Sequence, residues 1–212
     1  MEGIFYILVL IMSIVIHEVA HGYSAYLLGD NTAKDEGRLT LNPIKHLDPF
    51  GSVILPLMLV LLNTGFFIGW AKPVPYNPRN LKNGRMGDLI VSISGILTNL
   101  AVAIFFGLLM NFAPALGLTN ILSDGGQAFY QISSMIVIVN LVLALFNLVP
   151  IPPLDGSKIL FSILPLRFAY IQEFLEKWGF PILVIFIVFG WKFVAPLVFV
   201  FFKFLTGVDL VM

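Results

Sequence analysis

The residues with the clearest chemical potential lie in a short run near the start of the chain, His17-Glu18-Val19-Ala20-His21. His17 and His21 are four residues apart, so on an α-helix they project from the same face, one turn apart. Two imidazole nitrogens at that spacing can bind one Zn²⁺ ion. Glu18 can reach a water molecule at the metal without being a ligand, as the general base of a zinc peptidase does. The pattern predicts a zinc site with Glu18 as the catalytic base.

This run lies inside an apolar stretch, residues 3–28, that is long enough to cross a bilayer as a helix. Ionisable groups near the centre of a membrane cost several kcal/mol and persist mainly where they have a function. The alternative is that His17, Glu18 and His21 are buried polar groups that link neighbouring helices. The membrane setting favours the metal site over this alternative.

Two histidines supply only half of a tetrahedral zinc site, so a third ligand has to come from elsewhere in the chain. Asp155 is the better candidate, because it follows a proline-rich helix break at residues 150–154 and a carboxylate is an ordinary third ligand. The alternative for Asp155 is that it only caps a helix beginning near Gly156. The remaining histidine, His46, is the second candidate, although its polar surroundings are typical of an interfacial loop.

Asn147 lies eight residues before Asp155, at the inner end of its helix. An amide there can donate a hydrogen bond to the oxyanion that forms when water attacks a peptide carbonyl. The alternative is a structural hydrogen bond between helices. That structural role is the preferred interpretation of Asn99 and Asn140.

The composition is that of an integral membrane protein. Hydrophobic residues make up 58% of the 212 residues and charged residues only 11%, whereas soluble domains carry about 25% charged residues. The net charge is zero, which argues against nucleic acid as a partner. Because the chain has no cysteine, disulfides and thiolate metal ligands are excluded. The length suits a single domain over residues 1–212.

Long apolar stretches indicate an α-helical bundle of about four to five transmembrane helices. These stretches are residues 3–28, 88–112, 132–149 and 180–202. Gly190-Trp191-Lys192 divides the last one, which leaves open whether it is one span with a defect or two shorter segments. A short amphipathic helix is expected at residues 157–164.

Residues 52–62 are apolar but too short to span, since a helix of this length rises about 16 Å against a hydrocarbon core of ~30 Å. Lys and Arg occur on both sides of this segment, at positions 34, 38 and 45 before it and at 72, 79, 82 and 85 after it. If residues 52–71 enter the membrane and return, both basic clusters lie in the cytoplasm, as the positive-inside bias favours. We therefore expect a re-entrant segment rather than a crossing. The N-terminus and residues 113–131 then lie outside, and residues 30–87 and 150–178 lie inside.

Two short membrane-associated β-strands are also expected. Residues 37–41 alternate between polar and apolar side chains, and residues 68–77 carry Pro73 and Pro75 two positions apart, which is typical of extended chain. Lys72, Val74 and Tyr76 keep their backbone N–H groups on the opposite edge. We predict that this edge binds unwound substrate by β-strand addition. The alternative is a rigid surface loop with no partner.

Taken together, two motifs resemble the site-2 protease family of intramembrane zinc metalloproteases. They are residues 17–21, in the first helix, and residues 147–156, which read Asn-Leu-Val-Pro-Ile-Pro-Pro-Leu-Asp-Gly. Residues 37–49, 69–75 and 94–99 also resemble a compact prokaryotic branch of that family, so the likeness covers most of the chain. The sequence departs from many relatives in having Ile96 after Gly95 where they have proline, and it contains no PDZ or CBS domain.

The resemblance implies that His17, His21 and Asp155 bind one Zn²⁺ ion, that Glu18 is the catalytic base and that Asn147 helps to bind the oxyanion. It also implies cleavage of single-span membrane-protein substrates, in or near their transmembrane segments. The enzyme would then reside in the lipid bilayer of a prokaryotic cell membrane, with the active site towards the cytoplasm. The alternative function is a non-proteolytic zinc-binding scaffold or transporter, which would have no need of Glu18.

Overall fold

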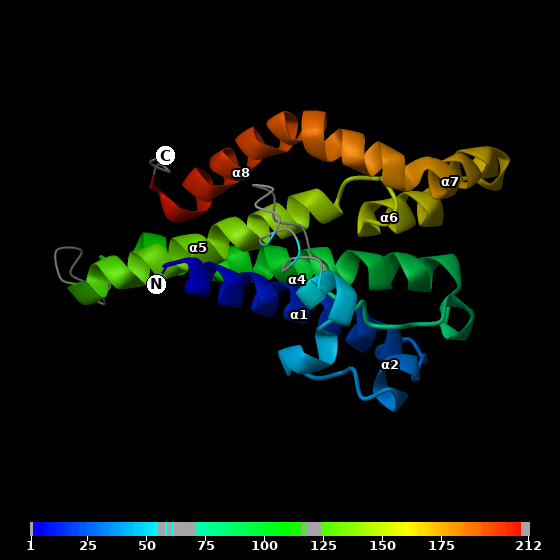
Figure 1. Cartoon of the computed structure of the whole chain (residues 1–212), viewed down its shortest axis with the longest axis horizontal. Coiled ribbons are helices and arrows are strands. Elements are labelled where there is room, and N and C mark those ends of the chain that lie inside the picture. Colours follow the sequence, from blue (N-terminus) through cyan, green and yellow to red (C-terminus); the bar gives the residue numbers. More distant parts are fainter. Residues whose placement is uncertain are drawn as a thin grey trace.

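A computed structural model describes residues 2–54, 58, 61, 71–115, 117 and 124–208 of the chain (Figure 1). Long helices run along the length of the molecule. The long helices are α1 (Glu2–Leu27), α4 (Arg85–Phe112), α5 (Asp124–Asn147), α7 (Ala169–Ile185) and α8 (Trp191–Thr206). The shorter ones are α2 (Thr32–Asp35), η1 (Pro43–His46), η2 (Pro49–Ile54), η3 (Pro78–Asn80), α6 (Asp155–Ile163), η4 (Leu166–Phe168) and η5 (Phe186–Gly190). Two of the short helices, α2 and α6, lie towards one end of the molecule (Figure 1).

The described residues contain four helices that are long and apolar enough to cross a membrane. They cover Phe5–Leu27, Arg85–Phe112, Gly125–Asn147 and Leu166–Thr206. The predicted helical membrane bundle is confirmed, with four candidate spans from the expected four to five. The third helix begins earlier than expected, because residues 124–131 continue its helical turns instead of forming a loop.

Helix α4 is at the centre of the packing, in contact with α1, α5, α6 and α8. A cluster of buried apolar side chains joins α4 to α5 and α8; its members are Ala103, Met110, Val137, Leu141, Val194, Val198, Phe202 and Leu205. Small residues along α4 let neighbouring helices approach its backbone closely. A second buried cluster contains Ala25 of α1 and Val91 of α4. The packing of these two helices determines which side chains meet between them.

The last apolar region is one continuous helical path with a defect. A π-helical turn, η5, joins α7 to α8, and Lys192 is exposed just after it. The path from Leu166 to Thr206 has 41 residues. At 1.5 Å per residue it is about 60 Å long, twice the ~30 Å hydrocarbon core. Its first part, which carries Glu173, Glu176 and Lys177, therefore extends beyond the hydrocarbon.

The predicted β-strands are wrong for the described residues, which form no strand. Residues 37–41 are irregular, and the only pairing among the described residues is an isolated antiparallel bridge between Leu47 and Ala71. Some backbone N–H and C=O groups that would pair with a neighbouring strand are hydrogen-bonded to side chains or to isolated carbonyl groups instead. The carbonyl oxygen of Thr40, for example, faces the ring nitrogen Nε2 of His46 at 2.8 Å. The predicted re-entrant segment falls largely outside the described residues, which show one π-helical turn, η2, at its start.

Helix α5 ends at Asn147, two residues before the expected end at position 149 and three before Pro150, the first proline of the helix break. Residues 148–154 form a tight turn, and α6 starts at Asp155 rather than at the expected position 157. The turn brings α6 back against α4. It thereby returns the chain to the level of α1, where His17 and His21 lie.

Candidate metal centre

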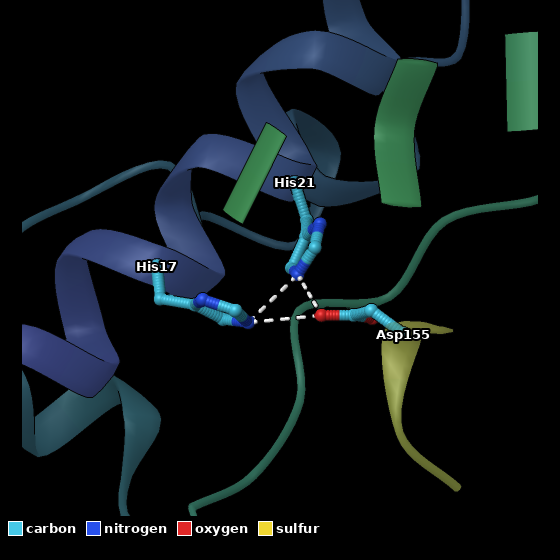
Figure 2. A group of neighbouring side chains, drawn as sticks. All are labelled: His17, His21 and Asp155. Atoms are coloured by element: carbon cyan, nitrogen blue, oxygen red, sulfur yellow. Dashed lines mark hydrogen bonds and ion pairs between the residues drawn. The ribbon is translucent and has the colours of Figure 1, made fainter. Parts of the chain in front are cut away.

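His17 and His21 lie one turn apart on the face of α1 that packs against α4. Asp155, the first residue of α6, points towards them from the other side (Figure 2). Asp155 Oδ2 is 3.0 Å from His17 Nε2 and 3.0 Å from His21 Nε2, and the two nitrogens are also 3.0 Å apart. All three residues are buried. The two histidines and the carboxylate predicted as ligands are therefore brought together in one group.

The chemistry of these three atoms fits a metal ion. His21 Nδ1 lies 2.7 Å from the carbonyl oxygen of Val91, so it carries the proton that it donates there. The Nε2 atom of His21 is then a lone-pair acceptor, and it faces a carboxylate oxygen. Converging acceptors repel one another unless a cation joins them. A tetrahedral zinc ion with bonds of ~2.0–2.1 Å separates its ligand atoms by about 3.3 Å, close to the observed triangle.

Asp155 is oriented as a ligand and not as a helix cap. Leu154 occupies the N-cap position of α6, so the capping alternative for Asp155 is wrong. Its second oxygen, Oδ1, lies 3.8 Å from Lys158 Nζ. Burial raises the pKa of the Asp155 carboxyl, but the adjacent His17 and His21 outweigh this effect and hold the pKa below its ordinary value. The group is therefore ionised at neutral pH, as a metal ligand has to be.

Gly95 of α4 makes room for the two histidines. A Cβ atom at this position would lie 2.5 Å from His21 Nε2 and 2.7 Å from His17 Cε1. Any side chain larger than hydrogen would therefore enter the space of the imidazole rings. The sequence alone did not predict this contact. A glycine in mid-span was the available signal, but its target depends on how the helices are rotated.

Glu18 is half-buried, and its carboxylate is held by the chain between η2 and η3. The backbone N–H of Val74 donates a hydrogen bond of 2.7 Å to Glu18 Oε2. Within the described part of the chain, no hydrogen bond reaches the other oxygen, Oε1. The sequence did not predict this contact, because 56 residues separate its partners.

Asn147 and His46 have other partners in this structure. Asn147 is half-buried, and its Nδ2 donates to the carbonyl oxygen of Leu143, one turn back in α5, at 3.0 Å. Its oxyanion role stays a prediction. His46 is buried near Thr40, and it does not belong to the group of metal-binding side chains found among the described residues. The second candidate for the third ligand is therefore not supported.

The segment predicted to bind substrate forms neither helix nor strand at residues 72–77, and the backbone N–H groups of Lys72 and Val74 are already engaged. Lys72 donates its backbone N–H to the carbonyl oxygen of His46 at 2.8 Å, and Val74 donates to Glu18. The hydroxyl of Tyr76 donates to Asp88 Oδ1 at 2.7 Å. Substrate binding by this edge stays a prediction, and it would require Lys72 and Val74 to change partners.

Fold and site together define a class of protein: a helical membrane protein with a buried centre of two histidines and one carboxylate, a ligand set used by catalytic zinc sites. The model of peptidase family M50 matches residues 126–190. A Bacillus subtilis (strain 168) protein named "Putative zinc metalloprotease YwhC" is 43% identical over 193 residues, which cover 90% of this chain and 80% of that protein. The chain therefore belongs to peptidase family M50, the site-2 protease family.

Two further relatives are more distant. A Mycolicibacterium smegmatis protein named "Putative zinc metalloprotease Rip2" is 30% identical over 84% of this chain and 64% of its own length. The protein of the same name in Mycobacterium tuberculosis (strain H37Rv) is 29% identical over 69% of this chain and 52% of its own length. No solved structure matches the chain. The family model matches a region that includes Asp155 but not His17 and His21. In the structure, the two histidines lie in one group with Asp155.

Proposed function

We propose that this intramembrane zinc metalloprotease holds one zinc ion through His17, His21 and Asp155, and hydrolyses peptide bonds within or near transmembrane segments. The observation that carries the proposal is the buried triangle of ligand atoms, each 3.0 Å from the other two, at the level of membrane-spanning helices. Family membership supports the peptidase chemistry. Zinc, when bound, supplies Lewis acidity that activates water and polarises a peptide carbonyl.

Glu18 is the general base in this proposal. One carboxylate oxygen is fixed by the Val74 N–H, which leaves Oε1 to accept the proton of the attacking water. The same carboxyl group then returns that proton to the amine that leaves when the peptide bond breaks. Asn147 would donate its amide N–H to the oxyanion, for which it has to release the carbonyl oxygen of Leu143.

Charge distribution supports a cytoplasmic site in a prokaryotic cell membrane. Ten of the twelve Lys and Arg residues belong to the segments around α2, η3, α6 and the start of α7; the exceptions are Lys192 and Lys203. Of these segments, α2, α6 and α7 lie at the end of the bundle opposite the two chain ends (Figure 1). The positive-inside bias favours that end as the cytoplasmic one.

Cysteine labelling tests this orientation directly, because the chain contains no cysteine. Glu36→Cys and Gln127→Cys place a thiol at exposed positions on the two ends. A maleimide that cannot cross membranes should label Gln127→Cys on intact cells, and Glu36→Cys only after permeabilisation. The reverse result would contradict the proposed orientation.

We propose a single-span membrane protein as substrate, entering from the lipid bilayer. Its helix has to unwind locally, because a helical peptide carbonyl is shielded and hydrogen-bonded. The predicted docking edge of Lys72, Val74 and Tyr76 would receive the unwound chain after exchange of the hydrogen bonds now made by Lys72 and Val74.

The decisive experiment compares the native chain with Glu18→Gln in cells that co-express a panel of single-span substrates. The amide keeps the shape of the side chain but cannot accept a proton, so cleavage should fall by about 10²–10⁴-fold while zinc content is unchanged. Glu36→Gln is the matched control, since it is the same substitution at an exposed position. Native cleavage rates in Glu18→Gln would overturn the protease mechanism and favour a zinc-binding scaffold or transporter.

A further inference from the structure

The extended segment 71–77 is pressed against α1 beside the metal centre. Val74 is only 5% exposed, and its Cγ1 atom lies 2.6 Å from where a Cβ atom on Gly22 would be. Because Gly22 has no side chain, the Val74 backbone can come close enough to α1 for its N–H to reach Glu18. The hydrogen bond to Glu18 thus depends on where this segment is held.

Arg38 fixes the segment at the residues just before Val74. Its guanidinium nitrogen Nη2 donates to the carbonyl oxygen of Lys72 at 2.8 Å and to that of Pro73 at 3.3 Å. The side chain is buried, with 4% of its surface exposed. A buried guanidinium that bonds two successive carbonyl groups restrains both the position and the direction of the chain between them. The carbonyl oxygen of His46 supports the same place by accepting the Lys72 N–H.

Asp30 fixes the segment at its other end. This carboxylate is completely buried at the end of α1, and it accepts hydrogen bonds from the Asn77 backbone N–H at 2.7 Å and from Asn80 Nδ2 at 2.8 Å. The Thr32 hydroxyl also donates to it, at 2.7 Å. The segment is therefore anchored on both sides of Val74, by one buried cation before it and one buried anion after it.

We propose that Arg38 is a positioning residue for catalysis. By binding the carbonyl groups of Lys72 and Pro73, it maintains the hydrogen bond from the Val74 N–H to Glu18. The carboxylate of a glutamate can adopt many orientations, and a charge-assisted hydrogen bond to one oxygen removes most of that freedom. Oε1 then stays directed for proton transfer. This inference rests on the proposed role of Glu18 as the general base. It narrows the docking proposal made above: the Val74 N–H stays with Glu18, and only Lys72 and Tyr76 of the predicted edge remain for the substrate.

The first test replaces Arg38 with Gln in the purified full-length protein, and uses a single-span substrate. Loss of positioning should lower kcat by about 10–100-fold, the scale on which a misplacement of about 1 Å acts, while KM stays within twofold and zinc content is unchanged. Arg38→Lys keeps the charge but not the double hydrogen bond, so it should recover part of the loss. Arg79→Gln is the matched control, because Arg79 is exposed, and its activity should equal the native value.

A second test moves Val74 without removing a charge, in case Arg38→Gln fails to fold. Gly22→Ala introduces a Cβ atom 2.6 Å from Val74 Cγ1 and 2.8 Å from Leu39 Cδ2, so the Val74 side chain has to move away from α1. It should lower kcat at unchanged zinc content. Adding Val74→Ala removes the clashing methyl group and keeps the backbone N–H, so the double variant should regain part of the lost kcat.

The outcomes separate this inference from the proposed function. If Glu18→Gln is inactive but Arg38→Gln and Gly22→Ala keep the native kcat, the positioning role is wrong and the base assignment stands. A rise in KM at native kcat would show that Val74 and its neighbours bind substrate instead. A rise in kcat would show that the hydrogen bond from Val74 to Glu18 inhibits catalysis, and it would contradict the positioning role. Native activity in Glu18→Gln would overturn both proposals.

Discussion

Replacing Gly95 with alanine should damage the metal centre more than its small volume suggests. The new Cβ atom would lie 2.5 Å from His21 Nε2 and 2.7 Å from His17 Cε1, whereas ordinary contacts begin near 3.4 Å. Helix α4 or the imidazole rings therefore have to move by about 0.9 Å. Zinc sites tolerate deviations of about 0.2 Å in ligand distance, so the displacement exceeds the tolerance severalfold. We expect zinc affinity to fall by at least about 10–100-fold, the scale reported for lost support of a ligand.

Zinc affinity of the purified protein can be measured by competition with a chelator, and turnover with a single-span substrate in the same preparation. Two further glycines supply controls. Gly107→Ala would place a Cβ atom 2.7 Å from Leu205 Cβ, so it should weaken the packing of α8 and lower the Tm without loss of zinc. A Cβ atom at Gly125 would meet no described atom within 4 Å, so Gly125→Ala should change neither the Tm nor the zinc content. If Gly95→Ala bound zinc and turned over substrate within twofold of the native protein, the close approach of α4 to the histidines would be refuted.

Three other substitutions test single contacts. Asn147→Ala should lower turnover by about 10²–10³-fold with zinc intact if the amide binds the oxyanion, whereas a lower Tm with native turnover would favour its structural bond to Leu143. His46→Ala should keep full zinc content, and loss of zinc would return His46 to the ligand set. For Asp30, burial favours the neutral acid, but hydrogen bonds from Thr32, Asn77 and neighbouring donors hold its pKa below the ordinary value. Its stabilising effect is therefore present above the pKa of the unfolded chain and is lost as the pH falls through the folded-state pKa. Asp30→Asn should lower the Tm at pH 7 and make it less dependent on pH below about 4, as thermal scans in detergent would show.

The bundle could be predicted from the sequence because long apolar stretches have few alternatives in a membrane. Without water, backbone groups have to be satisfied within a helix, so the length of each apolar run nearly determines the element. The side chains that share one face of a helix can be predicted from the sequence equally well. Residues four apart share a face in any α-helix, and for that reason His17 and His21 could be paired before any tertiary contact was known.

Tertiary structure decided everything that depends on how separate elements meet. Asp155 is 138 residues from His17. Residue chemistry offered it only as the better of two candidates, and the family resemblance was needed to single it out. The strand prediction for residues 37–41 and 68–77 failed because alternation and proline spacing report extended chain, not a partner strand. In this protein the partners are the side chains of Arg38 and Glu18 and a carbonyl group of η1.

Sequence by itself thus determined the membrane setting, the histidine pair and the acidic residue beside it, since each follows from composition or from the geometry of a single helix. Only the tertiary structure placed Gly95 against the imidazole rings and the Val74 N–H on Glu18. Both contacts depend on rotations and separations of packed segments to within about 1 Å. Local propensities do not encode such distances, because they arise from the packing of all the segments at once.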